Sequence, residues 1–191
     1  MKLVDKPLTT VLEEFRSSAP TPGGGSASAL SGAVGASLLA MVSGLPRPQA
    51  STEPDLRRLT DAGHRCADRA RRLEALIDDD SDAYERLMSA YRLPKGTDED
   101  KQRRSERIQE ALKGATETPL EIMRSCASAM AEETVVRELS NPNAASDTGV
   151  AIELLRAGLR GARLNVEINL GSVRDAAYVA RVQQEVAELD R

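Results

Sequence analysis

The chain has 191 residues, a length that suits one domain with a core large enough to fold without disulfide bonds or structural metal ions. Its 26 basic and 30 acidic side chains give a net charge of −4, which argues against nucleic acid as the main partner. Aromatic residues make up 2% of the sequence and Trp is absent from it, which argues against a β-sandwich or barrel packed on rings. We therefore expect an aliphatic core.

Metal-binding and nucleophilic residues are scarce. The sequence holds one histidine, His64, and two cysteines, Cys66 and Cys126. They form no CxxC or HExxH motif, so we expect no metal site. His64 and Cys66 are two residues apart and would point to different faces of a helix, which argues against a base and nucleophile pair. The N-terminus lacks the apolar segment of a signal peptide, and we expect a cytoplasmic protein.

Residues 17–46 carry no charge, a run of 30 residues that is long enough to cross a membrane. Serine and glycine dilute the large apolar side chains of this run, so it would be a poor membrane anchor. We predict a core helix enclosed by protein on all sides instead. Its small residues would let neighbouring helices approach closely.

The first half of the chain predicts three helices. Apolar residues between 8 and 15 indicate a short amphipathic helix, and the uncharged helix follows and ends near Gly44. A third helix begins after Thr52, where Pro and acidic residues stand in the first turn. Core positions then alternate at spacings of three and four up to Tyr91, which predicts one long helix packed nearly parallel to its neighbours.

The second half predicts further helices. One begins near residue 98, and Pro119 predicts a kink or a restart, because Thr118 to Glu121 has the pattern of a capping box. A loop at 140–143 precedes a helix that runs to about Leu170, and a last amphipathic helix ends near Leu189. With no sustained strand alternation in the sequence, we predict an all-α, up-and-down bundle of about six helices around the buried helix, as one domain over residues 1–191.

Asp80 occupies a core position of the long helix, where an apolar residue would cost less free energy. It either pairs with a neighbouring helix or lies in a pocket with a raised pKa, suited to acid or base catalysis. Tyr84 and Tyr91 are predicted on the same face of the helix as Asp80, where they either line a pocket for a flat heterocycle or pack in the core. Lys95 follows the break at Pro94 and is either an anion-binding or acidic group or an exposed lysine.

Two junctions between a loop and a helix carry further polar groups. Gly23-Gly24-Gly25-Ser26 opens a helix whose free N–H groups can hold a carboxylate or carbonyl-like oxygen, although a flexible linker explains the same residues. Asn141, Asn143, Ser146 and Asp147 stand at the second junction, where Ser146 and Asp147 can also serve as helix caps.

The helix that ends near Leu170 contains two asparagines. Its predicted core positions are small or apolar except for Asn165, and Asn169 follows one turn later; these positions are Ala151, Leu154, Gly158, Gly161, Asn165 and Ile168. A buried asparagine needs a hydrogen-bond partner, which is either another helix or a ligand.

These residues belong to five motifs that resemble, in order, those of one enzyme family. The motifs are Pro20 to Ala29, Asp80 with Ala83 and Tyr84, Tyr91 to Lys95, Asn141 to Gly149, and Leu164 to Leu170. The chain resembles, from about residue 7 to 185, the cyclodeaminase domain of formiminotransferase-cyclodeaminase and the related bacterial methenyltetrahydrofolate cyclohydrolases.

The resemblance implies a dimeric helical bundle that binds a reduced folate without a metal or another cofactor. Members either close formiminotetrahydrofolate to the methenyl form with loss of ammonia or hydrolyse the methenyl form to formyltetrahydrofolate. Beside the catalytic candidates Asp80, Lys95 and Asp147, the substrate-binding residues that it implies are Pro22, Gly23, Gly24, Gly25, Ser26, Tyr84, Tyr91, Asn141, Asn143, Ser146, Asn165 and Asn169.

One segment departs from the family pattern. Relatives commonly follow the buried helix with a basic stretch rich in Gly and Lys, whereas residues 45–51 here contain one Arg and no Lys. If that stretch holds the anionic tail of the substrate, binding is weaker here or the substrate is another formimino or amidine-like compound. A non-catalytic folate-binding dimer is a further alternative, and neither nucleic acid nor membrane is an expected partner.

Overall fold

The structure is a computed structural model that describes residues 2–47 and 52–190. Within these ranges the chain is helical, with no regular strand, which confirms the predicted all-α class. The helices are α1 (Leu8–Arg16), α2 (Gly24–Ser43), α3 (Glu53–Tyr91), α4 (Asp98–Met130), α5 (Glu133–Leu139), α6 (Ala145–Leu170) and α7 (Ala176–Leu189), with short 3-10 turns η1 (Leu3–Asp5) and η2 (Pro142–Ala144).

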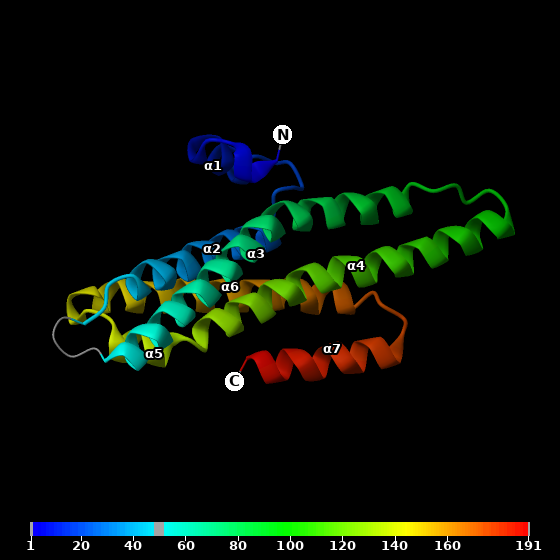
Figure 1. Cartoon of the computed structure of the whole chain (residues 1–191). Helices are drawn as coiled ribbons and strands as arrows, with labels where there is room; N and C mark the ends of the chain where they lie inside the picture. Colours follow the sequence, from blue (N-terminus) through cyan, green and yellow to red (C-terminus); the bar gives the residue numbers. More distant parts are fainter. Residues whose placement is uncertain (1, 48–51, 191) are drawn as a thin grey trace.

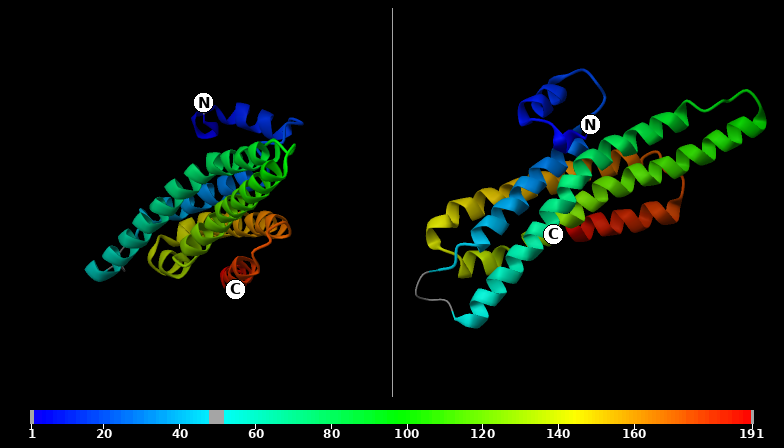
Figure 2. Two further views of the ribbon diagram at one scale, coloured as in Figure 1. Left: turned by 90° about the vertical axis from the view of Figure 1, so that its right-hand side faces the viewer. Right: turned by 45° about the horizontal axis from the view of Figure 1, so that its top comes forward.

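Four long helices form the body of the molecule. Helix α2 packs against α3 on one side and α6 on the other, and α4 contacts both α3 and α6 (Figure 1). Helix α7 lies along α4, and α1 stands outside the body (Figure 2). The far ends of α3 and α4 project beyond the body as a two-helix arm (Figure 1). The arm has its own small apolar cluster, which consists of Ala83, Leu87, Ala90, Ile108, Leu112 and Ala115.

Glycines bring α2 and α6 into close contact, as the small residues predicted. A Cβ atom on Gly35 would lie 2.7 Å from the carbonyl oxygen of Ala151, and one on Gly158 would lie 2.8 Å from that of Ser28. Any larger residue would push these backbones apart.

Two local predictions on helix boundaries were wrong. Of the kink or restart predicted at Pro119, the restart is absent, because α4 continues through Pro119 and its capping box is formed at its start by Thr97 and Asp100. Helix α6 begins after the 3-10 turn η2 with no side-chain cap, so Ser146 and Asp147 lie within its first turn and do not cap it. The N-terminal cap of α3, where the Thr52 hydroxyl accepts from the Asp55 N–H, confirms that predicted start.

Helix α2 is not enclosed on all sides within one chain. Its length and apolar composition would allow it to cross a membrane, but 56% of its most apolar 18-residue stretch is buried inside the structure. A strip of apolar side chains on α2 and α6, called here the outer face, is exposed by 44% at Val34, 45% at Met41, 53% at Val150, 67% at Leu164 and 74% at Ile168. The predicted core position at Ile168 was therefore wrong.

Candidate active site

A cavity of about 200 Å³ lies where the N-terminus of α2 meets α3, α4 and α6. Its lining brings together many of the predicted site residues from distant parts of the sequence. These residues are Gly23, Gly24 and Gly25 from α2 and its preceding loop, Asp80 and Tyr84 from α3, and Asn165 and Asn169 from α6. Asp80 is the one acidic residue in this lining, which contains no basic residue.

Ser26 holds the Asp80 carboxylate. The Ser26 N–H donates to Oδ2 of Asp80 at 2.9 Å, and the Ser26 hydroxyl lies 3.1 Å from the same oxygen and 2.9 Å from the Ile77 carbonyl oxygen. Burial raises the pKa of Asp80, and the two Ser26 interactions offset part of that rise because they stabilise the ionised form. The carboxyl group is therefore a better proton acceptor than an exposed aspartate.

The glycine beside Ser26 allows this contact. A Cβ atom on Gly25 would lie 2.0 Å from Oδ1 of Asp80 and 2.4 Å from its Cγ, so the carboxylate rests directly on the Gly25 backbone. At Gly24, a Cβ atom would lie 3.4 Å from Nδ2 of Asn165, which closes the other side of the cavity. The peptide bond between Thr21 and Pro22 in the preceding loop is cis.

Both asparagines on α6 are anchored through their side-chain nitrogens. Nδ2 of Asn165 donates to the Gly161 carbonyl oxygen at 2.9 Å, and Nδ2 of Asn169 donates to the Ala115 carbonyl oxygen at 2.8 Å. Because Nδ2 is used in this way, the Oδ1 atom of each side chain remains as a hydrogen-bond acceptor. The site thus combines a carboxylate and amide oxygens with the N-terminus of α2, a pattern that can bind the N–H groups of a heterocycle on one side and an oxygen on the other.

Tyr84 lines the cavity, but Tyr91 and Lys95 lie on the arm. Tyr91 is 40% exposed, and the Arg104 guanidinium lies 5.8 Å from its ring centroid and donates to its carbonyl oxygen. Tyr91 lies eleven positions after Asp80, which corresponds to about 16 Å along the helix. Lys95 is exposed in the loop after α3, further along the arm.

Asn141, Asn143, Ser146 and Asp147 gather at the opposite end of α6. The side-chain oxygen of Asn141 accepts from the Asn143 N–H at 3.0 Å, and the Asn141 N–H donates to the Leu45 carbonyl oxygen at 2.7 Å. Since Asp147 and Asn165 are 18 residues apart on one helix, about 27 Å separates the two groups. Within one chain, the predicted site residues therefore form two polar clusters at opposite ends of α6, and Tyr91 and Lys95 lie apart from both on the arm.

The structure adds residues that the sequence did not indicate. The hydroxyl oxygen of Ser81 lies 3.3 Å from that of Ser26, and the Ala115 carbonyl oxygen anchors Asn169. Ser81 lies beside the core stripe of α3 and had no pattern to mark it. For Ala115, Pro119 is a signal that could have been used, because a proline cannot donate the helical hydrogen bond to the carbonyl oxygen four residues earlier. Residues 48–51 of the atypical segment lie outside the described residues.

Comparison with known proteins identifies the family of the chain. The family model for formiminotransferase-cyclodeaminase matches residues 7–188. The chain is 41% identical over 185 residues to the methenyltetrahydrofolate cyclohydrolase of Methylorubrum extorquens, with 95% of this chain and 88% of that protein covered. It is 36% identical to the formimidoyltransferase-cyclodeaminase of Sus scrofa, of which it spans 35%.

A solved structure shares the fold. The formiminotetrahydrofolate cyclodeaminase of Thermotoga maritima superposes with a TM-score of 0.81 at 28% identity, over 97% of this chain and 88% of that one. The family match covers almost all of the residues that build the cavity and both polar clusters. The chain is therefore a member of the formiminotransferase-cyclodeaminase family.

Proposed function

We propose that the chain is a folate one-carbon enzyme that acts on C–N bonds at the amidine-like carbon of a tetrahydrofolate derivative. The observation that carries this proposal is the Asp80 carboxyl group, which lies at the cavity with a raised pKa and shares the cavity lining with Asn165 and Asn169. The nearly complete overlap with a methenyltetrahydrofolate cyclohydrolase favours hydrolysis of 5,10-methenyltetrahydrofolate to 10-formyltetrahydrofolate.

Asp80 would act as the general base and then as the acid. In hydrolysis, it accepts a proton from water while the water oxygen bonds to the methenyl carbon, which gives a tetrahedral carbinolamine. The bond from that carbon to N5 then breaks as N5 receives a proton and the carbonyl forms, so that one proton is released overall. A carboxyl group with a raised pKa suits both transfers near neutral pH.

The cyclodeaminase reaction uses the same groups. N10 attacks the carbon of the protonated formimino group of 5-formiminotetrahydrofolate, and Asp80 accepts the proton of N10. Asp80 then passes that proton to the exocyclic nitrogen, whose bond to the carbon breaks, so that ammonia leaves and the 5,10-methenyl form remains. The fold shared with a formiminotetrahydrofolate cyclodeaminase keeps this reaction as the second candidate. Asn165, Asn169 and the turn at Gly24 would position the heterocycle in both reactions.

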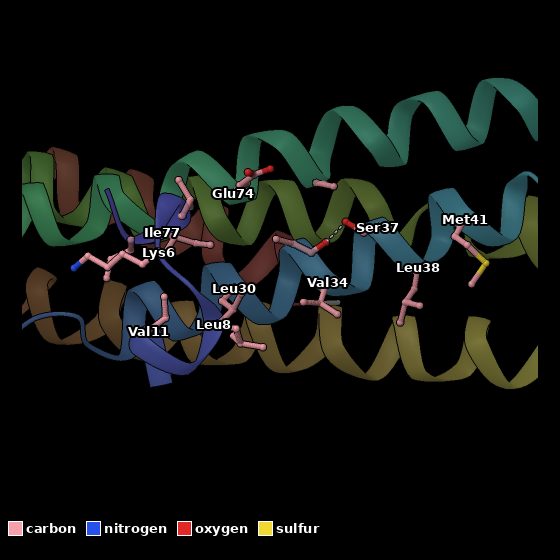
Figure 3. Close-up of a pocket in the computed structure, with 14 residues that line it drawn as sticks. Lys6, Leu8, Val11, Leu30, Val34, Ser37, Leu38, Met41, Glu74 and Ile77 are labelled. Carbon is pink, nitrogen blue, oxygen red and sulfur yellow. Dashed lines mark hydrogen bonds between the residues drawn. The ribbon is translucent and has the colours of Figure 1, made fainter. Parts of the chain in front are cut away.

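In a homodimer, the polar cluster of one chain could lie beside the cavity of the other chain. The outer face of α2 and α6 is apolar, and Figure 3 shows Val34, Leu38 and Met41 projecting from α2 along a groove of about 530 Å³ that Leu8 of α1 also borders. A second copy would cover this face, since a single soluble chain rarely leaves so many large apolar side chains exposed together.

The symmetry of such a dimer bears on the site. A two-fold axis across the middle of α6 would place the partner's Asp147 beside the end of α6 that carries Asn165. Asp147 would then act as a second acid or base, and Asn141, Asn143 and Ser146 would complete the binding site from the partner. Tyr91 and Lys95 on the arm would contact the outer, anionic part of the ligand, because the length of α3 separates them from Asp80.

The remaining assignments follow from this chemistry. Proton transfer at a C–N bond needs no redox or electrophilic cofactor, so we infer that tetrahydrofolate enters as substrate and that no metal is required. We also infer a cytoplasmic enzyme whose partner is a second copy and not nucleic acid or a membrane, in keeping with its net charge of −4.

Parallel assays test the function. Purified protein is mixed with 5,10-methenyltetrahydrofolate and, separately, with 5-formiminotetrahydrofolate; the ultraviolet absorbance of the methenyl form and released ammonia are followed. Loss of methenyl absorbance above the spontaneous rate supports hydrolysis, and ammonia release supports the cyclodeaminase. Binding of both compounds without turnover would favour a non-catalytic folate-binding dimer. Absence of binding would favour another formimino or amidine-like substrate.

A further inference from the structure

The Gly25-Ser26 turn faces Asp80. Ser26 is fully buried, and both its N–H and its hydroxyl point to Oδ2 of Asp80. Gly25 leaves the space that Oδ1 and Cγ of Asp80 occupy. From sequence, this turn was expected to bind the substrate, but a buried serine that uses its donors inside the protein has none to offer a ligand.

The Ser26 hydroxyl has one proton and two acceptors. The Ile77 carbonyl oxygen lies at 2.9 Å and Oδ2 of Asp80 at 3.1 Å, while the Ser81 hydroxyl, at 3.3 Å, can donate to the Ser26 oxygen. When Asp80 is ionised, the Ser26 hydroxyl forms its stronger hydrogen bond with the carboxylate, because a hydrogen bond to a charged acceptor is stronger than one to a neutral carbonyl. When Asp80 is protonated, the hydroxyl can turn to the Ile77 carbonyl.

We propose that Gly25 and Ser26 are positioning residues that fix the Asp80 carboxylate for proton transfer at the cavity. This inference rests on the proposed function of Asp80. Ser26 of α2 is hydrogen-bonded to Asp80, and the residues that share the cavity lining with Asp80 are uncharged, with Tyr84 on α3 as the other titratable group among them. Burial of Asp80 favours its protonated state, and the Ser26 hydrogen bonds favour its ionised state.

A pair of serine variants tests the role of the hydroxyl. Ser26→Ala removes one stabilising hydrogen bond from ionised Asp80, so the acidic limb of the kcat/KM profile moves up by about one pH unit. The control is Ser28→Ala, because Ser28 is also buried on α2 but its hydroxyl donates to the Gly24 carbonyl oxygen at 2.7 Å. No shift in Ser26→Ala, or an equal shift in both variants, would overturn the proposal.

A pair of glycine variants tests the position. Gly25→Ala displaces the carboxylate, and we expect kcat to fall by about 10²-fold while KM changes less, because a small misplacement of a reacting group has that effect. The control is Gly114→Ala on α4, where a Cβ atom would have no atom within 4 Å. Circular dichroism confirms that both variants are folded. Full kcat in Gly25→Ala would contradict the proposal.

A measurement without turnover separates this inference from the proposed function. The carboxyl carbon of Asp80 is titrated by NMR, with its signal assigned from its loss in Asp80→Asn. An increase in its pKa in Ser26→Ala, but not in Ser28→Ala, supports the positioning role even if wild-type protein converts neither folate. Identical titration curves would reject that role even if the wild type is active.

Discussion

Asn169 supplies the hydrogen bond that Pro119 cannot make. Its Nδ2 donates to the Ala115 carbonyl oxygen at 2.8 Å, the atom that the N–H of a residue at position 119 would reach in a regular helix. This contact satisfies the carbonyl that Pro119 leaves without its helical partner, and it ties a residue of the cavity to the continuity of α4.

A double-mutant cycle follows from this contact. Asn169→Ala leaves the Ala115 carbonyl without a partner and should lower the free energy of unfolding by about 1–3 kcal/mol, as measured by urea denaturation. In a Pro119→Ala background, the new N–H at position 119 can bond that carbonyl, so the same change should cost less. Equal costs in the two backgrounds would show that the residues are not coupled.

Asp80→Asn should reduce kcat/KM by about 10²–10⁴-fold, because the amide cannot exchange protons with the substrate or water. The fold should persist, since an amide oxygen can still accept from Ser26. Asp82→Asn is the matched control, since Asp82 is exposed two residues away on the same helix. Activity is measured with both folate substrates, and near-normal turnover in Asp80→Asn would remove Asp80 from the mechanism.

The same variant should be more stable than the wild type at alkaline pH. The pKa of Asp80 is raised by burial in the folded state, so the unfolded chain ionises first as the pH rises. The folded state then loses relative stability up to its own, higher pKa, and at low pH the penalty vanishes. Melting temperatures should therefore favour Asp80→Asn at pH 8 and converge with the wild type near pH 3. A constant difference across this range would contradict the prediction.

Leu164→Asp should disrupt the proposed dimer. It places a charge in the outer face, where desolvation upon association would oppose binding of a second copy. Sedimentation should show a dimer for the wild type and a monomer for Leu164→Asp, with turnover lost in the monomer. Ala187→Asp, on the exposed surface of α7, is the control and should stay dimeric. A wild-type monomer with full activity would contradict the arrangement.

Mixed dimers test whether the two polar clusters meet across the axis. Asp80→Asn and Asp147→Asn should each have little activity alone. After the two are unfolded together and refolded, half of the dimers are mixed, and one site in each mixed dimer is intact, so about a quarter of wild-type activity should return. Refolding each variant separately is the control. No recovery would show that each site draws both aspartates from one chain.

Periodicity and helix signals made much of the fold predictable. The spacing of core positions in α3 gave one long helix and placed Asp80 on its packed side, because the pattern reflects contacts over many turns. The restart predicted at Pro119 was wrong, because Asn169, which bonds the Ala115 carbonyl in place of the missing N–H, is distant in sequence. Ser146 and Asp147 have capping side chains, but the 3-10 turn before them already sets the start of α6.

The site was only partly predictable. The motifs contain Asp80 and Asn165, yet nothing in one sequence shows that the N–H and the hydroxyl of Ser26 donate hydrogen bonds to Asp80. The separation of Asp147 from Asn165 follows from helix length alone once both lie on α6. Ile168 illustrates a deeper limit: an apolar stripe has the same period whether it packs against its own chain or against a second copy.

The arm has a consequence for local opening. Its apolar cluster around Leu87, Ile108 and Leu112 is separate from the main core, so the arm can unfold while the body stays intact once Gln109 gives up its hydrogen bonds to Ser172 and Arg174. Backbone amides of the arm should therefore exchange with deuterium before those of α2. Tyr84 stands where the arm joins the body, so a bound ligand that touches it should slow exchange well beyond the cavity itself.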